Sequence, residues 1–586
     1  MTSAPPVTSA VRTPSDLRWA PWHTGLVVLA AASALVYLWA LNVGQRSEYY
    51  AAIAVSMSQN WSNFFFGSLD PAGTVTLDKI PGSYWFPALF VKAFGFSTWA
   101  VNAPNAIATV VAVILIAVAV KRLAGPTAGL LAGAIFASTP IVAAVARSNQ
   151  PQSFFLLTLA LVLWSTTRAL QKNSLGHLVL AGVWIGLAFQ TYMLEAWAVW
   201  PALIVADLFF STTSWLKRIR DLVIAGATSL VVSLSWIFVV SLIPASSRPY
   251  IGGTYSNSAW EMVFGYNGLG RFSETSSSTA AYRSFTPPFS GSASALRLFN
   301  EQLAGQIAWL IPTTILAIVV LIVLKFNRAI TVLLSVWFVT FAFMFSVVAG
   351  MHQFYTSALA VPMAALIGIA FAESFKKKIL WAQLGIIGLS VATSIFIGLT
   401  YSSYLPWLPW VQLTIGIAAA VAVVLVREIK LVRTWWVAVL VGASLVLTPA
   451  VWSVDVINHP SPINPVAGNG LTMDGGFGGM GAPGLGMPGQ GQLPAGPPPG
   501  MTGQGGMPGA GGHGGFGGPG GFGGFGGPTG VSANSALLKF LQANRGEATY
   551  LFAVFGAQAA APYITSTGES VLPIGGFDGS DPVPTM

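Results

Sequence analysis

The feature that most constrains this chain is a long series of apolar segments, each of about the length that crosses a lipid bilayer as a helix. Of the 586 residues, 54% are hydrophobic and only 8% are charged, and the mean hydropathy is +0.68. This composition predicts an integral, mainly α-helical membrane protein. We expect about thirteen spans, at residues 24–41, 98–120, 127–145, 153–170, 177–191, 195–211, 222–243, 306–324, 329–349, 355–374, 379–399, 406–426 and 434–454. The residues between 190 and 195 form either a short turn or part of one broken helix.

Basic residues between the apolar segments predict how the chain is oriented in the membrane. Short connections rich in Lys and Arg recur at every second gap, as at residues 121–122, 217–220 and 376–378. The positive-inside rule places these connections in the cytoplasm, together with an N-terminal tail at residues 1–22. The long segments 42–97 and 244–305, and everything after about residue 455, then lie outside the cell membrane.

Charge and cysteine content exclude several classes of function. The net charge of +9 is spread over short connections rather than gathered in a patch, so we expect no nucleic-acid partner. The chain has no cysteine, which excludes disulfides, thiolate metal sites and cysteine nucleophiles. The first apolar run lacks the small-residue cleavage site of a signal peptide, so we interpret it as a retained anchor.

The C-terminal part changes composition twice. We expect a membrane domain over residues 23–466, followed by a Gly- and Pro-rich segment at 467–530 that favours a flexible, disordered linker. Ordered sequence returns at 531–586, where SANSALLKFLQANRG predicts a helix and ATYLFAVFG predicts a buried strand. We therefore expect a small α/β module outside the membrane, and the sequence leaves open whether this module is complete.

The first outer loop holds three carboxylates in a chain with few of them: Glu48, Asp70 and Asp78. Before Asp70, apolar side chains recur every three or four residues, which predicts an amphipathic helix lying at the headgroup level. This stripe consists of Tyr50, Ile53, Met57, Trp61 and Phe64. The DPAG and IPG sequences that follow predict turns, so both aspartates should lie on loops beside the membrane.

Several motifs resemble the PMT-like branch (glycosyltransferase family 39) of the GT-C membrane glycosyltransferases, especially bacterial members related to protein mannosyltransferases and the aminoarabinose transferase. They are EYYAAIAVSM, NFFFGSLDPAGTVTLDKIPGSYW, SSRPYIGGTYSNSAWEMVFGYNGLGRF, GQIAWLIP, MHQFYTSALAVP and the ending AQAAAPYITSTGESVLPIGGFDGSDPVPT. The resemblance covers nearly the whole chain outside the Gly-rich segment. It implies a polytopic GT-C fold with a helical outer loop beside the membrane.

The resemblance also implies a reaction and its partners. Enzymes of this kind take a sugar from a polyprenyl-phosphate donor in the membrane and transfer it, usually with inversion, to a hydroxyl of a protein, glycan or lipid outside it. The reaction needs a carboxylate that accepts the acceptor proton. It also needs a cation, either side chains or a divalent metal ion, at the phosphate leaving group. The sequence identifies neither the sugar, the acceptor nor a metal.

For the catalytic base we favour Asp70 and Asp78, followed by Glu48. Each also has a purely structural interpretation. Asp70 precedes a proline and can serve the turn alone, Asp78 can simply pair with Lys79, and Glu48 can cap a helix. For the phosphate or lipid donor, the candidates outside the membrane are Lys79, Arg147, Arg248, Arg271, His352 and Tyr355. For the sugar or acceptor, the candidates are Glu195, Tyr50 and Asn267.

The chain departs from the family pattern at several polar positions. Many relatives carry an Asp-Glu pair near Arg46 and Ser47, and an acid where this chain has Gln152. Where they read TKMLQ, residues 191–195 here read TYMLE. Two alternatives to a glycosyltransferase therefore stay open. One is a catalytically inactive scaffold that binds lipid-linked sugar or cell-wall glycan, and the other is a transporter, against which the absence of an inverted repeat counts.

Overall fold

The computed structural model describes residues 21–43, 46–268, 290–348, 351–400, 405–428, 434–458, 464–468, 535–577, 579 and 581–584. Within them the chain is mainly helical, as the sequence predicts. The chain divides into two compact units, residues 1–471 with 533–586, and residues 472–532. The second unit, and nearly all of the predicted linker, lie outside the described residues.

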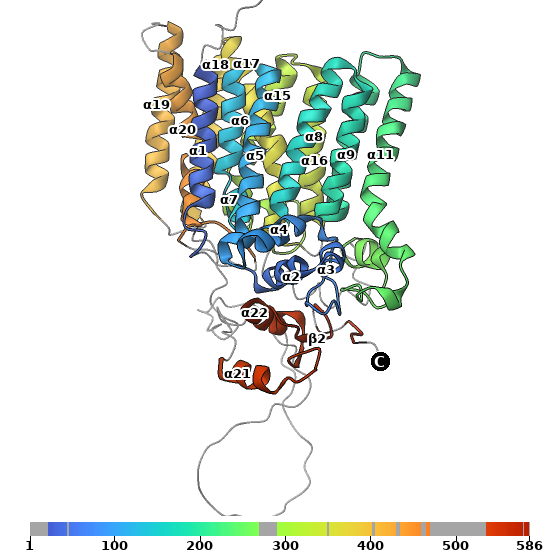
Figure 1. The fold of residues 1–586 in the computed structure, drawn as a ribbon. Coiled ribbons are helices and arrows are strands. Elements are labelled where there is room, and N and C mark those ends of the chain that lie inside the picture. The colour runs from blue at the N-terminus through green and yellow to red at the C-terminus, as the bar shows by residue number, and fades with distance from the viewer. Residues whose placement is uncertain are drawn as a thin grey trace, which may run out of the picture. The chain divides into compact units, whose positions relative to one another are not determined.

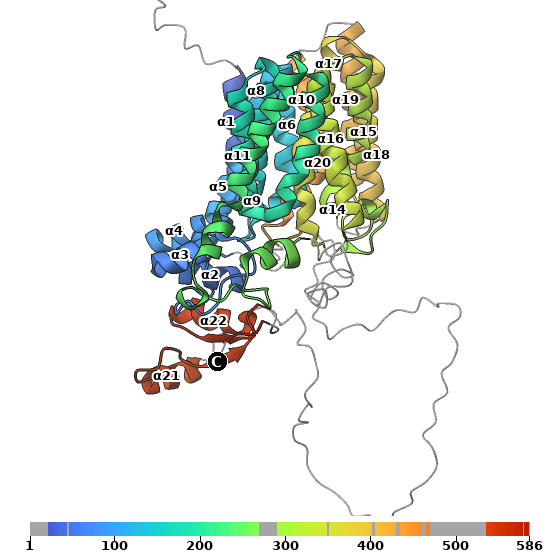
Figure 2. The same ribbon diagram turned by 90° about the vertical axis from the view of Figure 1, so that its right-hand side faces the viewer.

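The membrane helices run roughly parallel to one another (Figure 1 and Figure 2). They are α1 (Pro21–Leu38), α5 (Thr98–Ala124), α6 (Pro126–Ser138), α7 (Pro140–Ala146), α8 (Gln152–Lys172), α9 (Leu175–Tyr192), α10 (Trp200–Phe210), α11 (Trp215–Leu242), α15 (Ile311–Val323), α16 (Arg328–Val347), α17 (Ala360–Lys376), α18 (Leu380–Thr400), α19 (Leu408–Glu428) and α20 (Thr434–Asp455). Short 3-10 and helical turns precede two of them: α14 (Ala304–Ile307) and η8 (Ala308–Leu310) before α15, and η9 (Gln353–Leu359) before α17.

The number of long apolar helices is smaller than the predicted number of spans. In the described part of the chain, 11 helices are long and apolar enough to cross a membrane, or up to 12 when the bent pair α6 and α7 counts as one span. The predicted count of thirteen is therefore not confirmed. The difference arises at Leu175–Phe210, which forms a single apolar stretch of 36 residues and which the sequence predicts as two spans.

Hydrogen bonds show that this stretch turns back on itself. Asn173, before α9, donates its side-chain amide to the Thr212 hydroxyl at 2.9 Å and accepts from the Ser211 hydroxyl at 3.2 Å. A straight helix of this length would separate its ends by about 54 Å. The chain reverses at Met193, where φ is +52° and the 3-10 segment η3 (Met193–Val199) begins. Both ends of the stretch therefore lie on one side of the bundle.

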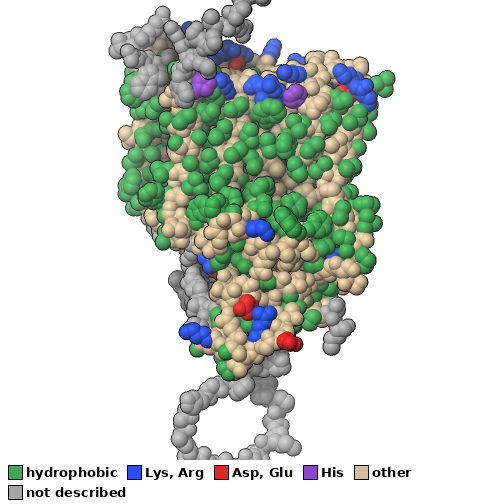
Figure 3. All heavy atoms as spheres, viewed as in Figure 1, with side chains coloured by type: hydrophobic (Ala, Val, Ile, Leu, Met, Phe, Trp, Pro, Cys, Tyr) green, Lys and Arg blue, Asp and Glu red, His purple; other side chains and the backbone are tan. Residues whose placement is uncertain are grey.

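Charged side chains distinguish the two ends of the bundle. Figure 3 shows Lys and Arg gathered at the end of the helices opposite to the outer helices α2 (Glu48–Gln59), α3 (Trp61–Phe66) and α4 (Trp85–Phe94). Hydrophobic side chains cover the surface between the two ends. Charge avoids the bilayer interior because its desolvation there is costly. This distribution agrees with a multi-pass membrane protein.

The outer loop differs in one respect from the single amphipathic helix that the sequence predicts. Asn60 ends α2 and caps α3 by accepting a bond from the Asn63 amide, so two helices form instead of one. Ile53 and Met57 are buried, whereas Trp61 is 69% exposed. Helix α2 is buried over most of its length because α22 (Ala557–Thr567) of the C-terminal segment packs on it. It is therefore an internal helix and does not lie freely at the interface.

The C-terminal segment consists of α21 (Ser535–Asn544), β1 (Ala553–Phe555), α22 and β2 (Leu572–Ile574). The two strands pair in parallel, with Ala553 opposite Leu572 and Phe555 opposite Ile574. A parallel pair needs a crossover connection, which α22 supplies. We call residues 535–584 the C-terminal module. Its small residues Ala557, Ala560 and Ala561 are fully buried, which allows α22 to approach α2 closely.

Short turns complete the outer side: η2 (Pro81–Ser83), η4 (Ala245–Ser247), the π-helical η5 (Glu261–Tyr266) and η7 (Arg297–Phe299). Of these, η2 and η5 flank the loop that carries Asp78. The Ser83 hydroxyl bonds the carbonyls of Pro151 and Thr191, each at 3.1 Å, which ties this loop to α8 and α9.

Candidate active site

The loop from Gly67 to Ile80 is folded back as an irregular hairpin. Leu69 donates to Val75 and Leu77 donates to Gly67, both at 2.9 Å. Gly67 has a φ of +73°, and a side chain there would meet Leu77 at 2.3 Å, so the position requires glycine. Outer residues 250–254 pair with this loop, because Thr76 donates to the Tyr250 carbonyl at 2.8 Å and Tyr250 donates to Thr74 at 3.0 Å.

Asp70 is used by the turn itself. Its carboxylate accepts the Thr74 amide at 3.0 Å and the Thr74 hydroxyl at 2.9 Å, and its carbonyl accepts the Gly73 amide at 3.0 Å. The side chain is fully buried. Burial raises the pKa of the Asp70 carboxyl above its ordinary value, although the Thr74 hydrogen bonds oppose this shift. The geometry therefore agrees with the structural interpretation of Asp70 as a turn residue.

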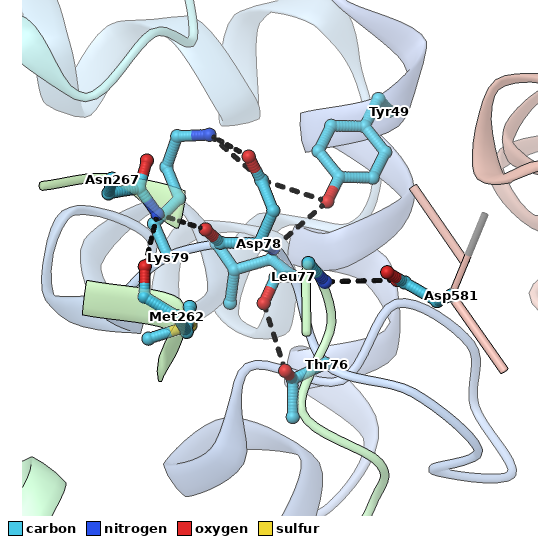
Figure 4. A network of polar contacts seen from close by, with 9 residues as sticks. Tyr49, Thr76, Leu77, Asp78, Lys79, Met262, Asn267 and Asp581 are labelled. Carbon is cyan, nitrogen blue, oxygen red and sulfur yellow. Dashed lines mark hydrogen bonds and ion pairs between the residues drawn. The ribbon is translucent and has the colours of Figure 1, made fainter. Parts of the chain in front are cut away.

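Asp78 and Lys79 form an ion pair at the centre of the outer side (Figure 4). The Lys79 ammonium donates to both carboxylate oxygens of Asp78, at 2.8 and 2.7 Å. Asp78 is 2% exposed, and Tyr49 on α2 donates its hydroxyl to the same carboxylate at 3.2 Å. Asn267, after η5, donates its side-chain amide to the Asp78 carbonyl at 2.7 Å and to the Met262 carbonyl at 3.0 Å.

Aromatic rings surround this pair. The Lys79 ammonium lies 5.5 Å from the ring centre of Tyr50 and 5.8 Å from that of Phe577, a residue of the C-terminal module. Tyr50 stacks on Tyr84 at 4.9 Å, and Tyr49 contacts Phe577 at 4.9 Å. Such rings attract the ammonium and exclude water from it. Because water is excluded from this cation, an anion that enters the site would be attracted to it strongly.

The electrostatics favour a permanently charged lysine. Burial alone lowers the pKa of the Lys79 ammonium, but the charge of the Asp78 carboxylate and its hydrogen bonds raise it, and the net pKa is above the ordinary lysine value. Burial raises the pKa of the Tyr49, Tyr50 and Tyr84 phenols, which keeps them neutral. Tyr355 of the MHQFY motif lies within electrostatic range of the Lys79 ammonium.

Five predicted residues thus meet in one cluster: Asp78, Lys79, Tyr50, Asn267 and Tyr355. His352 adjoins it, since its ring stacks on Phe354 at 4.8 Å and packs against Tyr355 at 5.8 Å. We call this set, with Tyr49, Tyr84 and Phe577, the Asp78–Lys79 cluster.

Other predicted residues have different partners. Glu48 pairs with Arg46 at 3.0 Å and accepts the Thr565 hydroxyl of the C-terminal module at 2.9 Å. Arg147 is buried and donates to the Val36 carbonyl at 2.7 Å. Arg248 binds its own loop through Asn257, at 2.6 and 2.8 Å, and through Ile243 and Pro249 at 3.3 Å.

These contacts hold Arg147 and Arg248 to backbone and loop groups and do not bring them to the Asp78–Lys79 cluster, so their phosphate role stays a prediction. Glu195 lies in η3, half-buried beside the reversal of the α9–α10 stretch. Arg271 lies outside the described residues.

The sequence interpretation missed four residues of the site: Tyr49, Tyr84, Phe577 and Asp581. Asp581, in the C-terminal module, accepts the Gly253 amide at 2.9 Å, next to Asp78 (Figure 4). A signal was present, because Tyr49, Tyr84 and the GGFDG sequence all lie in the motifs that resemble the family.

A divalent metal ion does not fit the described residues of this site. No group of three or more His, Asp or Glu side chains in the described ranges is placed to hold a metal. The carboxylate at the centre, Asp78, already gives both oxygens to Lys79. A magnesium or manganese ion would need several oxygen ligands.

Two protein-family models match separate segments of this chain. Residues 78–238 match a family model described as "Dolichyl-phosphate-mannose-protein mannosyltransferase", and residues 537–586 match one described as "Putative mannosyltransferase YkcB-like, C-terminal". The crystal structure of ArnT from Cupriavidus metallidurans in the apo state has a TM-score of 0.50 at 16% identity, over 75% of this chain and 78% of that chain. At this identity the likeness to ArnT shows a shared fold, and each family model matches only a part of the chain.

Two relatives from Bacillus subtilis (strain 168) each match 96% of this chain. "Putative mannosyltransferase YkcB" from Bacillus subtilis (strain 168) is 28% identical over 96% of this chain and 86% of its own length. "Undecaprenyl phosphate-alpha-4-amino-4-deoxy-L-arabinose arabinosyl transferase 2" from Pseudomonas fluorescens (strain Pf0-1) is 30% identical over 33% of this chain and 35% of its own length. The resemblance that the motifs indicate is thus confirmed.

Proposed function

We propose that this protein transfers a sugar from a polyprenyl-phosphate donor to a hydroxyl of an acceptor outside the cytoplasm, with inversion at the sugar carbon. The observation that carries this proposal is the buried Asp78–Lys79 pair enclosed by aromatic rings on the outer side of the bundle. It offers a cation for a phosphate and a carboxylate for a proton in adjacent positions. The names of the two relatives, a mannosyltransferase and a transferase that uses undecaprenyl phosphate, support the same chemistry.

The pair explains how donor binding can activate the base. When the phosphate of the donor enters, it competes with Asp78 for the Lys79 ammonium, because phosphate oxygens accept charge-assisted hydrogen bonds as a carboxylate does. Asp78 is then left without its strongest partner in a buried site, which favours uptake of a proton. The acceptor oxygen bonds to the sugar carbon, the bond from that carbon to the phosphate oxygen breaks, the acceptor proton passes to Asp78, and polyprenyl phosphate leaves beside Lys79.

Replacing the lysine tests the phosphate role. We expect Lys79→Met to weaken binding of undecaprenyl phosphate by about 10- to 100-fold, because a hydrogen bond to a charged group is lost. Lys92→Met is the matched control, since Lys92 lies on the same outer layer, is exposed and contacts only Trp61 and the Ser58 carbonyl among described partners. Binding to protein in lipid nanodiscs measures the effect. Equal affinity of both variants and the wild type would refute this role.

The cysteine-free chain makes the proposed orientation testable. We propose that the N-terminus is cytoplasmic and that the Asp78–Lys79 cluster and the C-terminus face outward. In intact cells, a membrane-impermeant maleimide should label Ser566→Cys, because Ser566 is an exposed residue of α22. The same reagent should label Ser214→Cys, before α11, only after the cells are permeabilised. The reverse labelling pattern would contradict the orientation and place the cluster in the cytoplasm.

A second candidate function is a binding scaffold without catalysis. The observation that favours it is Gln152, which stands where many relatives carry an acid and whose two side-chain polar atoms are buried without a hydrogen-bond partner. Purified protein in nanodiscs, given a panel of undecaprenyl-phosphate sugars and extracted envelope acceptors, distinguishes the two. Sugar transfer supports the enzyme, whereas tight donor binding without any transfer supports the scaffold.

A further inference from the structure

Polar contacts between described residues join the C-terminal module, from Tyr550 to Asp581, to the outer loops. Tyr550 and Thr74 share a hydrogen bond at 2.7 Å, and Thr565 donates to Glu48 at 2.9 Å. Gln59 donates to the Gly568 carbonyl at 2.7 Å, and Gly253 donates to Asp581 at 2.9 Å. With the buried face of α22 against α2, these contacts fix the module at a defined position on the outer loops.

Two glycines bring Phe577 and Asp581 to the same face of the module. Gly575 and Gly576 have φ values of +81° and +62°, a conformation that residues with a side chain rarely adopt. A Cβ atom at Gly576 would lie 2.0 Å from the Asp581 carboxylate. The chain therefore doubles back here, so that Asp581 bonds to Gly253 while Phe577 contacts Tyr49 and Lys79.

From this placement we propose that Phe577 is a donor-specificity residue: its ring forms the wall on which the sugar of the lipid-linked donor stacks, so the C-terminal module completes the donor site. The inference rests on the proposed function, since it assumes that the donor phosphate binds at Lys79. In such a donor the sugar carbon is attached directly to a phosphate oxygen. A sugar ring therefore lies within a few ångströms of Lys79 whenever the phosphate is bound there.

The chemistry of the two groups matches. The C–H groups on one face of a sugar ring are apolar and carry a slight positive charge, and the face of an aromatic ring is negative, so the two attract. Phe577 has no polar atom, so packing is its only contribution. Its ring centre is 5.8 Å from the Lys79 ammonium on one side, and that of Tyr50 is 5.5 Å from the same atom. One wall of the site thus comes from the outer loop and the other from the module.

Two ligands separate a sugar-binding role from a packing role: undecaprenyl phosphate, and the same lipid carrying the sugar that the wild type uses. We expect Phe577→Ala in nanodiscs to bind the sugar-bearing lipid about tenfold more weakly, a loss typical of one aromatic contact. Its affinity for undecaprenyl phosphate should stay within about twofold of the wild type. Phe577→Trp should restore binding of the sugar lipid and change the preference among sugars.

Phe555→Ala is the matched control, because Phe555 belongs to the same module and is 78% exposed. It should bind both lipids like the wild type. If Phe577→Ala weakens both lipids equally, Phe577 is a packing residue and the inference is wrong. If Phe577→Ala binds both lipids normally, the inference is also wrong while the proposed function stands. If the wild type binds no sugar-bearing lipid, the proposed function fails first.

Discussion

Two aspartates of the same outer loop, Asp70 and Asp78, are equivalent in the sequence but have different surroundings in the structure. Both are buried, with Asp70 at 0% and Asp78 at 2% exposure. The partners of the Asp70 carboxylate come from its own turn, through Thr74. The Asp78 carboxylate pairs with its neighbour Lys79, but it also accepts from Tyr49 on α2, and the Asp78 carbonyl accepts from Asn267 after η5.

The comparison teaches that a functional carboxylate differs from a structural one less in burial than in where its partners lie along the chain. Local hydrogen bonds such as those of Asp70 suffice to shape a turn and need no charge. The phenol of Tyr49 and the amide of Asn267 come to Asp78 from distant parts of the chain and require the whole fold. Partners assembled from distant segments indicate that the charge of Asp78 has a function. Substitution of each aspartate tests whether the two carboxylates differ in this way.

The largest expected effect separates the two aspartates directly. We expect Asp78→Asn to lower the rate of sugar transfer by about 10²- to 10⁴-fold, the usual loss on removal of a general base. Asp70→Asn keeps an oxygen acceptor for the Thr74 amide, so its rate per folded molecule should fall by less than about threefold. Transfer by purified variants in nanodiscs measures both. A greater loss at Asp70 would reverse the assignment.

A smaller effect should follow from releasing Asp78 without changing its charge. Asn267→Leu removes the side-chain amide from both carbonyls and leaves that of Asp78 unpaired, at a cost of about 1–3 kcal/mol, whereas the Met262 carbonyl keeps the backbone amide of residue 267 at 3.0 Å. As a positioning residue, Asn267 should affect the turnover rate, about tenfold, and leave the KM for the donor nearly unchanged.

Asn105 offers a matched control for this variant. Its side-chain amide also donates to two carbonyls, of Ser148 at 2.7 Å and Gln150 at 2.6 Å. Asn105→Leu should lower thermal stability similarly but leave the turnover rate per folded molecule nearly intact. Equal loss of turnover in both variants would mean that Asn267 acts only through stability.

Much of the fold was predictable because hydropathy and charge encode it locally. The apolar segments predict membrane helices, and the small C-terminal elements near residues 535–555 follow from their own periodicity. At residues 190–195 the sequence leaves open a short turn or a broken helix, because a positive φ at a non-glycine residue such as Met193 has no sequence signal. The path of the α9–α10 stretch depends on side-chain hydrogen bonds between its two ends.

The candidate site was predictable only in part, for the same reason. Asp78 and Lys79 are adjacent in one motif, and Tyr50 lies in another motif of the same outer loop, so the sequence already places them near one another. Phe577 lies some five hundred residues further on, and nothing in the residues themselves indicates that the module packs on α2. Arg248 has the composition of a phosphate ligand, yet its donors bind Asn257, Ile243 and Pro249. Long-range packing decides the case of Phe577, and contacts within its own loop decide that of Arg248.

The smallest expected effect concerns stability and concerns Asp70 alone. Burial raises its pKa, so the folded protein binds a proton here more tightly than the unfolded chain does. The contribution of Asp70 to stability must then fall as pH rises from the ordinary value of about 3.9 through the raised pKa. Asp70→Asn cannot ionise and lacks this loss. The unfolding temperature of the variant relative to the wild type should therefore rise with pH over that window and level off above it. A difference that does not change with pH would show that the Thr74 hydrogen bonds fully offset burial, leaving Asp70 as free to ionise as an exposed carboxylate and weakening its contrast with Asp78.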